Sequence, residues 1–202
     1  MQDQNFLELL FNFFERFYPL SNALKLDYLQ HCSLMHIKKN KFILSPLDLN
    51  DSLFFINSGI VRGFVKNCNT DITTQFAAEG EVIGPIRHPE KKEHHSEEHL
   101  QALEDCTLVK IPYNLIESVY HKYPEAHLIG RKIFAIHLYR ASERSLLARL
   151  PKASERYHAF MNTDLEWANR IPLRYLASYL GMRLETLSRI RSAESKEHNL
   201  DE

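Results

Sequence analysis

The segment LASYLGMRLETLSRIR, Leu176 to Arg191, gathers side chains of types that can form hydrogen bonds with nucleic-acid bases. It holds three arginines and one acid, although the whole chain of 202 residues has a net charge of only −1. An arginine can bond both O6 and N7 of guanine, and a glutamate can accept a hydrogen bond from N4 of cytosine. Bulk charge points to no partner, so any nucleic-acid binding must come from a local patch such as this one.

At helical spacing, the polar residues of this segment fall on the side opposite Leu187 and Ile190. We predict that this side faces a DNA major groove and that four residues read bases, namely Glu185, Thr186, Ser188 and Arg189. Four surrounding arginines suit phosphate contacts, namely Arg170, Arg174, Arg183 and Arg191. Between residues 170 and 191, five arginines against one acid give a net charge of +4. The alternative is a structural helical hairpin with a solvated charged face.

The same segment has the small and apolar residues that a helix-turn-helix needs to position such a face. Two short helices that pack at a steep angle need a small residue where they cross, and Ala177 supplies it. Their turn needs a residue that tolerates a positive φ, and Gly181 supplies it four positions later. The inner faces would be lined by apolar residues, namely Leu176, Leu180, Met182, Leu187 and Ile190.

The N-terminal part predicts two helices followed by short strands. Phe6 to Phe17 has helical apolar spacing and Ser21 suits the cap of a second helix that runs to Cys32. The expected buried stripe of the first helix contains Phe6, Leu9, Leu10, Phe13, Phe14 and Phe17. From Met35 to Ile111, short apolar runs separated by turns predict a barrel or jelly roll, with a hairpin turn at Asn57-Ser58-Gly59 and another turn at Asn67 to Asp71.

After Pro124 the pattern becomes helical. We expect a long helix from Glu125 to Leu150, a break at Pro151 and a shorter helix from Ser154 to Met161. The long helix carries two apolar stripes, one of Ile129, Ile133 and Ile136 and one of Phe134, Leu138 and Ala141. Two stripes need two partners, such as the barrel and a second subunit, so we expect a dimer; the alternative is a core helix with intramolecular contacts alone.

Composition excludes several classes of protein. Hydrophobic residues make up 44% and charged residues 25%, as in an ordinary globular protein. Cys32, Cys68 and Cys106 are far apart and odd in number, which predicts ordinary thiols without a disulfide framework. We find no signal peptide, no membrane-spanning run and no catalytic motif, so we expect a cytoplasmic protein that is not an enzyme and needs no cofactor.

These motifs together resemble the Crp–Fnr family of bacterial transcription regulators over almost the whole chain. ETLSRIR, Glu185 to Arg191, resembles the family's recognition helix, and EGEVIG, Glu79 to Gly84, resembles the start of its phosphate-binding cassette. The resemblance implies an α+β fold with three parts, a β-roll sensor over 1–122, a dimerisation helix over 123–150 and a helix-turn-helix domain over 151–202. It implies base reading by Glu185 and Arg189. It also implies duplex DNA and a second copy of the chain as partners, with RNA polymerase as a further candidate.

The nucleotide pocket departs from the family's pattern. The family's binders of cyclic nucleotides follow the Gly-Glu pair with a second glutamate for the ribose and then with an Arg-Ser or Arg-Thr pair for the phosphate. In this chain EGEVIG runs into Pro85-Ile86, and the segment that should hold the Arg-Ser pair reads SEEHLQAL. Residues 79–105 hold eight acids against three bases, a net charge of −5 that repels a phosphate. We therefore expect no binding of cyclic AMP in the family's manner, and glycines that survive as turn formers. The expected degenerate pocket comprises Gly80, Glu81, Gly84, Glu97 and Glu98.

Two departures concern the DNA-binding end. The family's recognition helix often opens with Ser or Thr as N-cap, but Arg183 stands there, which removes a cap worth about 1 kcal/mol. The final SAESKEHNLDE is too short and polar for two strands, so we expect a short tail and no winged hairpin.

Two other classes of function stay open. The segment RHPEKKEHHSEEH holds His88, His94, His95 and His99, which could bind a divalent metal and make the barrel a sensor, although the segment lacks tight ligand spacing and a solvated loop is the alternative. The fold could also act through protein contacts after losing DNA binding, which Arg183 and Leu184 favour and the basic patch opposes.

Overall fold

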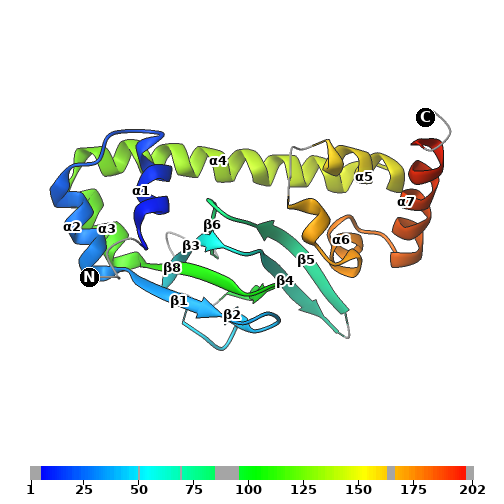
Figure 1. Cartoon of the computed structure of the whole chain (residues 1–202), viewed down its shortest axis with the longest axis horizontal. Coiled ribbons are helices and arrows are strands. Elements are labelled where there is room, and N and C mark those ends of the chain that lie inside the picture. Colours follow the sequence, from blue (N-terminus) through cyan, green and yellow to red (C-terminus); the bar gives the residue numbers. More distant parts are fainter. Residues whose placement is uncertain (1–5, 50, 69, 85–95, 163–166, 199–202) are drawn as a thin grey trace.

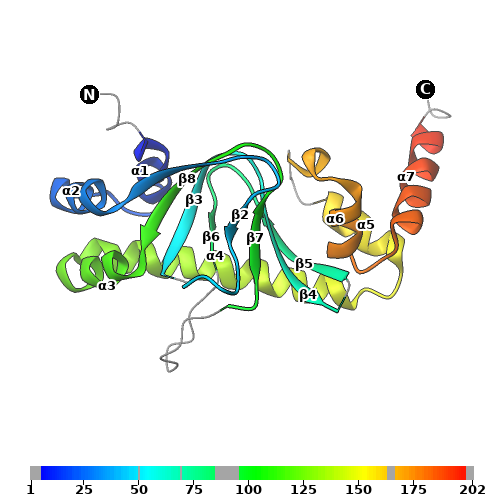
Figure 2. The ribbon, with the colours of Figure 1, turned by 90° about the horizontal axis from the view of Figure 1, so that it is seen from below.

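The computed structural model describes residues 6–49, 51–68, 70–84, 96–162 and 167–198. Helices at the two ends of the molecule flank a pair of β-sheets, and one long helix, α4 (Pro124–Arg149), runs along the whole assembly (Figures 1 and 2). The fold is α+β, as expected from the sequence. In the described part of the chain, no helix is long and apolar enough to span a bilayer.

Two short helices open the described chain, α1 (Glu8–Glu15) and α2 (Asn22–His31). Ser21 caps α2 as expected, because its hydroxyl oxygen accepts a hydrogen bond from the backbone N–H of Leu24 at 3.2 Å. The predicted buried stripe of α1 is partly wrong. Leu9 is half exposed, and Leu7, just before the helix, is fully buried instead.

The β-roll consists of two four-stranded antiparallel sheets. One sheet has the order β1 (Ser33–Ile37), β8 (Cys106–Pro112), β3 (Ser52–Ser58) and β6 (Val82–Ile83). The other has the order β2 (Phe42–Leu44), β7 (His99–Ala102), β4 (Val61–Asn67) and β5 (Thr70–Ala77). The turn after Asn67 joins β4 and β5 in a hairpin, with Asn67 opposite Thr70.

The hairpin predicted at Asn57-Ser58-Gly59 is wrong. β3 and β4 do not pair, since β3 belongs to the first sheet and β4 to the second. The chain crosses between the sheets at Gly59, whose φ is +98° and whose missing Cβ would lie 2.6 Å from Sγ of Cys106. A turn signature fixes where the chain bends, but pairing across the sheets is decided by long-range contacts.

The remaining elements are helical. The sequence did not predict α3 (Tyr113–Lys122), which follows the last strand directly. Next come α4, α5 (Ala153–Met161), a 3₁₀ turn at Ala168–Arg170, α6 (Leu173–Tyr179) and α7 (Leu184–His198). The bounds of α4 and α5 agree with expectation to within one residue. The expected tail is helical up to His198.

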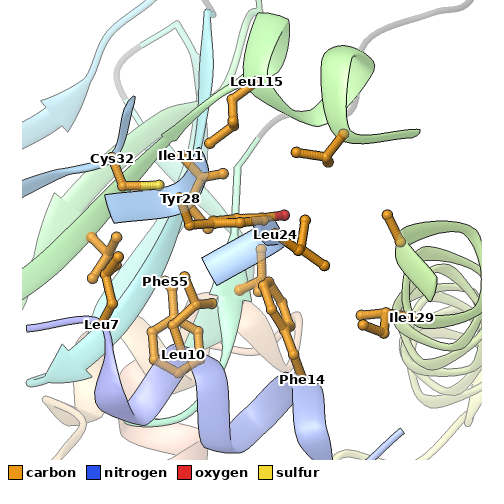
Figure 3. Packing of buried hydrophobic residues seen from close by; sticks show 14 residues of the cluster. Leu7, Leu10, Phe14, Leu24, Tyr28, Cys32, Phe55, Ile111, Leu115 and Ile129 are labelled. Carbon is orange, nitrogen blue, oxygen red and sulfur yellow. The ribbon is translucent and has the colours of Figure 1, made fainter. Parts of the chain in front are cut away.

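Three apolar clusters hold these parts together. In the first, α1 to α4 pack on the outer face of the first sheet, and Figure 3 shows Leu10 and Phe14 of α1 beside Leu24 and Tyr28 of α2. The second joins α5, α6 and α7 to the second sheet, and the third fills the inside of the roll. All three cysteines are free thiols, and burial raises the pKa of Cys32 to about 12.

Candidate nucleic-acid interface

Helices α6 and α7 form a helix-turn-helix around Gly181. The φ angle of Gly181 is +62°, as the sequence predicted, and its missing Cβ would meet no atom within 4 Å, so conformation rather than space demands glycine. The N–H of Met182 donates to the carbonyl of Ala177 at 3.0 Å, which closes the end of α6. The turn therefore fixes the angle between the two helices.

The predicted inner faces of the two helices are buried. Leu176, Ala177, Leu180 and Leu187 are at most 2% exposed, and Ile190 packs against them. Burying these side chains leaves only one side of α7 facing solvent. The packing thus orients α7 independently of any DNA.

The outward side of α7 carries the predicted base readers. Glu185, Ser188 and Arg189 are exposed, and Thr186 is half-buried. α7 begins at Leu184, and the carbonyl of Arg183 accepts hydrogen bonds from the N–H groups of Thr186 and Leu187. Arg183 therefore takes the capping position through its backbone, which leaves its exposed side chain for other contacts.

The four predicted phosphate contacts are not equivalent in the structure. Arg174, Arg183 and Arg191 are exposed around α6 and α7. The guanidinium of Arg174 lies over the Tyr175 ring and donates to its hydroxyl at 2.7 Å. Arg170 is engaged elsewhere, because its Nη2 donates to Glu79 of the roll at 2.8 Å and also to Glu104. A phosphate contact by Arg170 would have to replace these bonds.

The ion pair with Arg170 changes the pKa of the Glu79 carboxyl. Hydrogen bonds from Arg170, opposed by partial burial, lower the pKa of the Glu79 carboxyl to about 2. Glu79 also accepts a hydrogen bond from the N–H of Gly59 at 2.7 Å, at the crossing between the two sheets. The ion pair thereby ties the start of the helix-turn-helix to a fixed corner of the roll.

A second set of contacts docks α6 on the β4–β5 hairpin, and sequence reasoning missed it. The hydroxyl of Ser178 accepts from the N–H of Thr73 at 3.0 Å and donates to the carbonyl of Asp71 at 2.9 Å. The guanidinium of Arg62, which is 1% exposed, lies between the Phe64 and Tyr175 rings, with Cζ 4.2 and 4.0 Å from their centroids. Burial lowers the pKa of Arg62, and Asp71 opposes the shift.

The five residues of the expected degenerate pocket do not form one site. Gly80 has a φ of +78° and acts as a turn former, as expected, whereas Gly84 is needed for space, because a Cβ there would lie 2.7 Å from the Leu53 side chain. Glu81 pairs with Arg140 of α4 at 2.6 Å. Glu97 is exposed, and Glu98 turns inward.

The histidine-rich segment contributes little to the described structure. His88, His94 and His95 lie outside the described residues. His99 is a buried residue of β7, stacked on Phe64 with ring centroids 4.8 Å apart, and burial lowers its pKa. Within the described ranges, no three His, Cys, Asp or Glu side chains come together in a way that could hold a metal ion.

Comparison with known proteins places these features in context. No family model matches the chain. The transcriptional regulatory protein btr of Bordetella pertussis is 27% identical over 191 residues, covering 89% of this chain and 77% of its own length. The anaerobic regulatory protein of Haemophilus influenzae is 22% identical over 171 residues, and the match covers 76% of this chain but only 63% of that regulator.

Solved structures share the fold at low sequence identity. A putative transcriptional regulator of the Crp/Fnr family from Eubacterium rectale superposes with a TM-score of 0.69 at 18% identity, covering 92% of this chain and 88% of that one. Both sequence relatives carry the name of regulatory proteins, and that of Bordetella pertussis is named as transcriptional. The chain is thus similar in sequence to bacterial regulatory proteins, and it shares its fold with solved regulators of the Crp/Fnr family.

Proposed function

We propose that this regulator binds a two-fold-symmetric DNA site as a homodimer, without cyclic AMP. The observation that carries the proposal is the exposed side of α7, where Glu185, Ser188 and Arg189 point away from a buried inner face. A recognition helix reads base edges from its solvent side after its other side has packed on the domain. Thr186, half-buried at the edge of this face, completes the proposed base-reading set.

The proposed phosphate contacts surround this face. Arg174, Arg183 and Arg191 are exposed on α6, on the turn and on α7 respectively, and would set register on the duplex without reading sequence. Arg170 joins them only if its bonds to Glu79 and Glu104 open. The resulting footprint is basic although the whole chain is nearly neutral.

An apolar stripe on α4 supports the homodimer. Phe134 and Leu138 are each 61% exposed, and Ala141 extends the stripe by one further turn. The other stripe faces the roll, where Ile129 is buried and Ile133 half-buried. A second α4 packed along the exposed stripe would remove both large side chains from water and place two α7 helices on one duplex.

The chemistry beside β6 supports independence from cyclic AMP. The anion of a cyclic nucleotide needs donors and positive charge, but Glu98 lines the cavity near Gly84 and Glu81 is already paired with Arg140. RNA polymerase would be the further partner of a DNA-bound dimer. The proposed three parts of the chain, 1–122, 123–150 and 151–202, correspond to roll, dimer helix and DNA-binding unit.

Selection of bound duplexes from a random library tests the proposal. The selection is run at defined salt, with and without cyclic AMP, because phosphate contacts make affinity depend on salt. We expect a palindrome to be enriched both with and without cyclic AMP, with its half-sites about one helical turn apart. Enrichment only with cyclic AMP would contradict the argument on the pocket, and failure to enrich any sequence would contradict DNA reading.

A further inference from the structure

A cavity lies between the roll and the long helix. Its volume is about 620 Å³, in the range of small-molecule sites. Its walls come from α1, α2, α3 and α4 and from strands of both sheets, and most lining side chains are apolar. Figure 3 shows part of this wall, with Phe14, Leu24 and Tyr28 on one side and Ile129 of α4 on the other.

One carboxylate is fixed in the wall of this cavity. Glu98 accepts a hydrogen bond from the amide nitrogen Nε2 of Gln75 at 2.9 Å and another from the hydroxyl of Thr74. It lies over Gly63, where an added Cβ would be 2.7 Å from Oε1 of Glu98 and 2.6 Å from the Gln75 side chain. Glycine in β4 thus opens the space that the carboxylate occupies.

Glu98 has no cationic partner among the described residues. The other charged lining groups are the carboxylate of Glu117 on α3 and the guanidinium of Arg144 on α4. His137 of α4 also lines the cavity, and burial together with Arg140 and Arg144 lowers its pKa, which favours the neutral imidazole. The charged lining therefore consists of two carboxylates and one guanidinium, in an otherwise apolar wall.

The cavity overlaps the proposed dimer stripe of Phe134, Leu138 and Ala141 only in part. Ile129, Ile133 and His137 line it from the side of α4 that faces the roll, and these residues are buried or half-buried. Leu138 is exposed and does not line the cavity. Phe134 and Ala141, two of the three residues of that stripe, also line the cavity, but the rest of the lining comes mainly from α1, α2, α3, the strands and other residues of α4.

We propose that this cavity binds a small molecule with an apolar body and a cationic head, and that Glu98 receives the head. An apolar body would fill a space whose lining is poor in water-binding groups, and the fixed carboxylate would supply the specificity. The ligand's role as an effector rests on the proposed DNA-binding function, but its binding does not. The ligand class is opposite in charge to an anionic nucleotide.

A matched set of probes tests the ligand class. The full-length protein is titrated at neutral pH with 1-naphthylmethylamine, 1-naphthylmethanol and 1-naphthoate, which share an aromatic body but carry a cationic, neutral and anionic head. Binding is followed by naphthalene fluorescence and by calorimetry. We expect the amine to bind about tenfold more tightly than the carboxylate, with the alcohol between them. Tightest binding of the carboxylate, or no binding of any probe at millimolar concentration, would overturn the proposal.

Variants locate the head and the body of the probe. Glu98→Gln should abolish the preference for the amine over the alcohol while leaving binding of the alcohol unchanged, which also reports that the cavity is folded. Glu97→Gln, at the exposed neighbouring position, should keep the preference. Ile133→Trp should weaken all three probes by filling the space. If Glu97→Gln lost the preference for the amine as fully as Glu98→Gln, the preference would come from general surface charge. That result would overturn the assignment of the head to Glu98.

Two further results separate this proposal from the proposed function. Leu138→Glu should leave binding of the amine intact, because Leu138 lies outside the cavity. Loss of probe binding in that variant would assign the space to the contact between copies and overturn the ligand site. The duplex selection described above uses no probe. DNA reading can therefore fail while the cavity still binds the amine, and the cavity can fail to bind the amine while DNA is still read.

Discussion

At the scale of single residues, the outward side of α7 combines a carboxylate and a guanidinium one helical turn apart. Glu185 and Arg189 are separated by four positions on α7, so they project from one side of the helix. They differ in kind from Arg174, which is exposed on α6 and held against Tyr175. Base-edge contacts discriminate sequence, whereas phosphate contacts raise affinity for every sequence.

Arg189→Ala should therefore lower specificity. We expect a loss of about 1–3 kcal/mol on the selected site and relaxed preference at one base pair. The matched control is Arg174→Ala, which should weaken all sequences alike and reduce the slope of log affinity against log salt by about one. Both are measured by titrating cognate and random duplexes over a salt series. Equal losses on the two duplexes for Arg189→Ala would refute base reading by this residue.

At the scale of elements, the turn between α6 and α7 depends on the left-handed backbone of Gly181. The inner faces pack around Leu176 and Leu187, and the bond from Met182 to Ala177 closes α6. Because no atom lies within 4 Å of the missing Cβ, a larger residue meets strain in φ alone. The turn therefore offers a direct measure of conformational cost.

Gly181→Ala should destabilise the helix-turn-helix by about 1 kcal/mol, because alanine disfavours a positive φ. Gly181→Asn should cost less, since asparagine tolerates this conformation better. Urea unfolding is followed through the fluorescence of Trp167, the only tryptophan, which packs in the cluster around α6. Equal costs for alanine and asparagine would indicate a cause other than backbone strain.

At the scale of the whole molecule, polar contacts between described residues connect the roll to the helix-turn-helix. Arg170 binds Glu79 and Glu104, Ser178 binds the β4–β5 hairpin, and Arg62 of the roll lies over the Tyr175 ring. α4 passes alongside both parts and exposes an apolar stripe (Figures 1 and 2). The placement of α7 is therefore a property of the assembled chain rather than of one element.

The ion pair of Glu79 predicts that the free energy of unfolding depends on pH in the acid range. Because the folded state lowers the pKa of Glu79 from 4.5 to about 2, its stabilisation is fully present above pH 4.5 and is lost as the pH falls toward 2. Glu79→Gln should flatten this part of the stability profile, measured by urea unfolding between pH 2 and 6. Glu97→Gln serves as the exposed control. An unchanged profile in Glu79→Gln would contradict the assigned pairing.

The exposed stripe of α4 predicts the effect of a charge on association. Leu138→Glu should convert a dimer to a monomer, because a carboxylate loses its hydration when it is buried between two helices. Sedimentation equilibrium measures the association, and affinity for the selected palindrome should fall with it. Leu26→Glu is the matched control, since Leu26 is 56% exposed on α2, away from the stripe. Dimers that persist in Leu138→Glu would place the contact elsewhere.

The sequence by itself determined the local features of this protein. The cap of α2 at Ser21, the turn at Gly181, the limits of α4 and the two sides of α7 follow from residue type and helical spacing, which act over a few residues. The base-reading roles remain predictions from that pattern. Even local reasoning had limits, because α3 and the burial of Leu7 were missed.

Only the tertiary structure decided which distant groups meet. It assigned β3 and β4 to different sheets, bound Arg170 to Glu79, buried Arg62 beneath Tyr175, and turned Glu98 inward while leaving Glu97 exposed. Adjacent glutamates look alike in a sequence, and only the packing of the chain decides which of them faces inward. Contacts between residues far apart in the chain carry no periodic signal, so they become visible only after the sheets have formed.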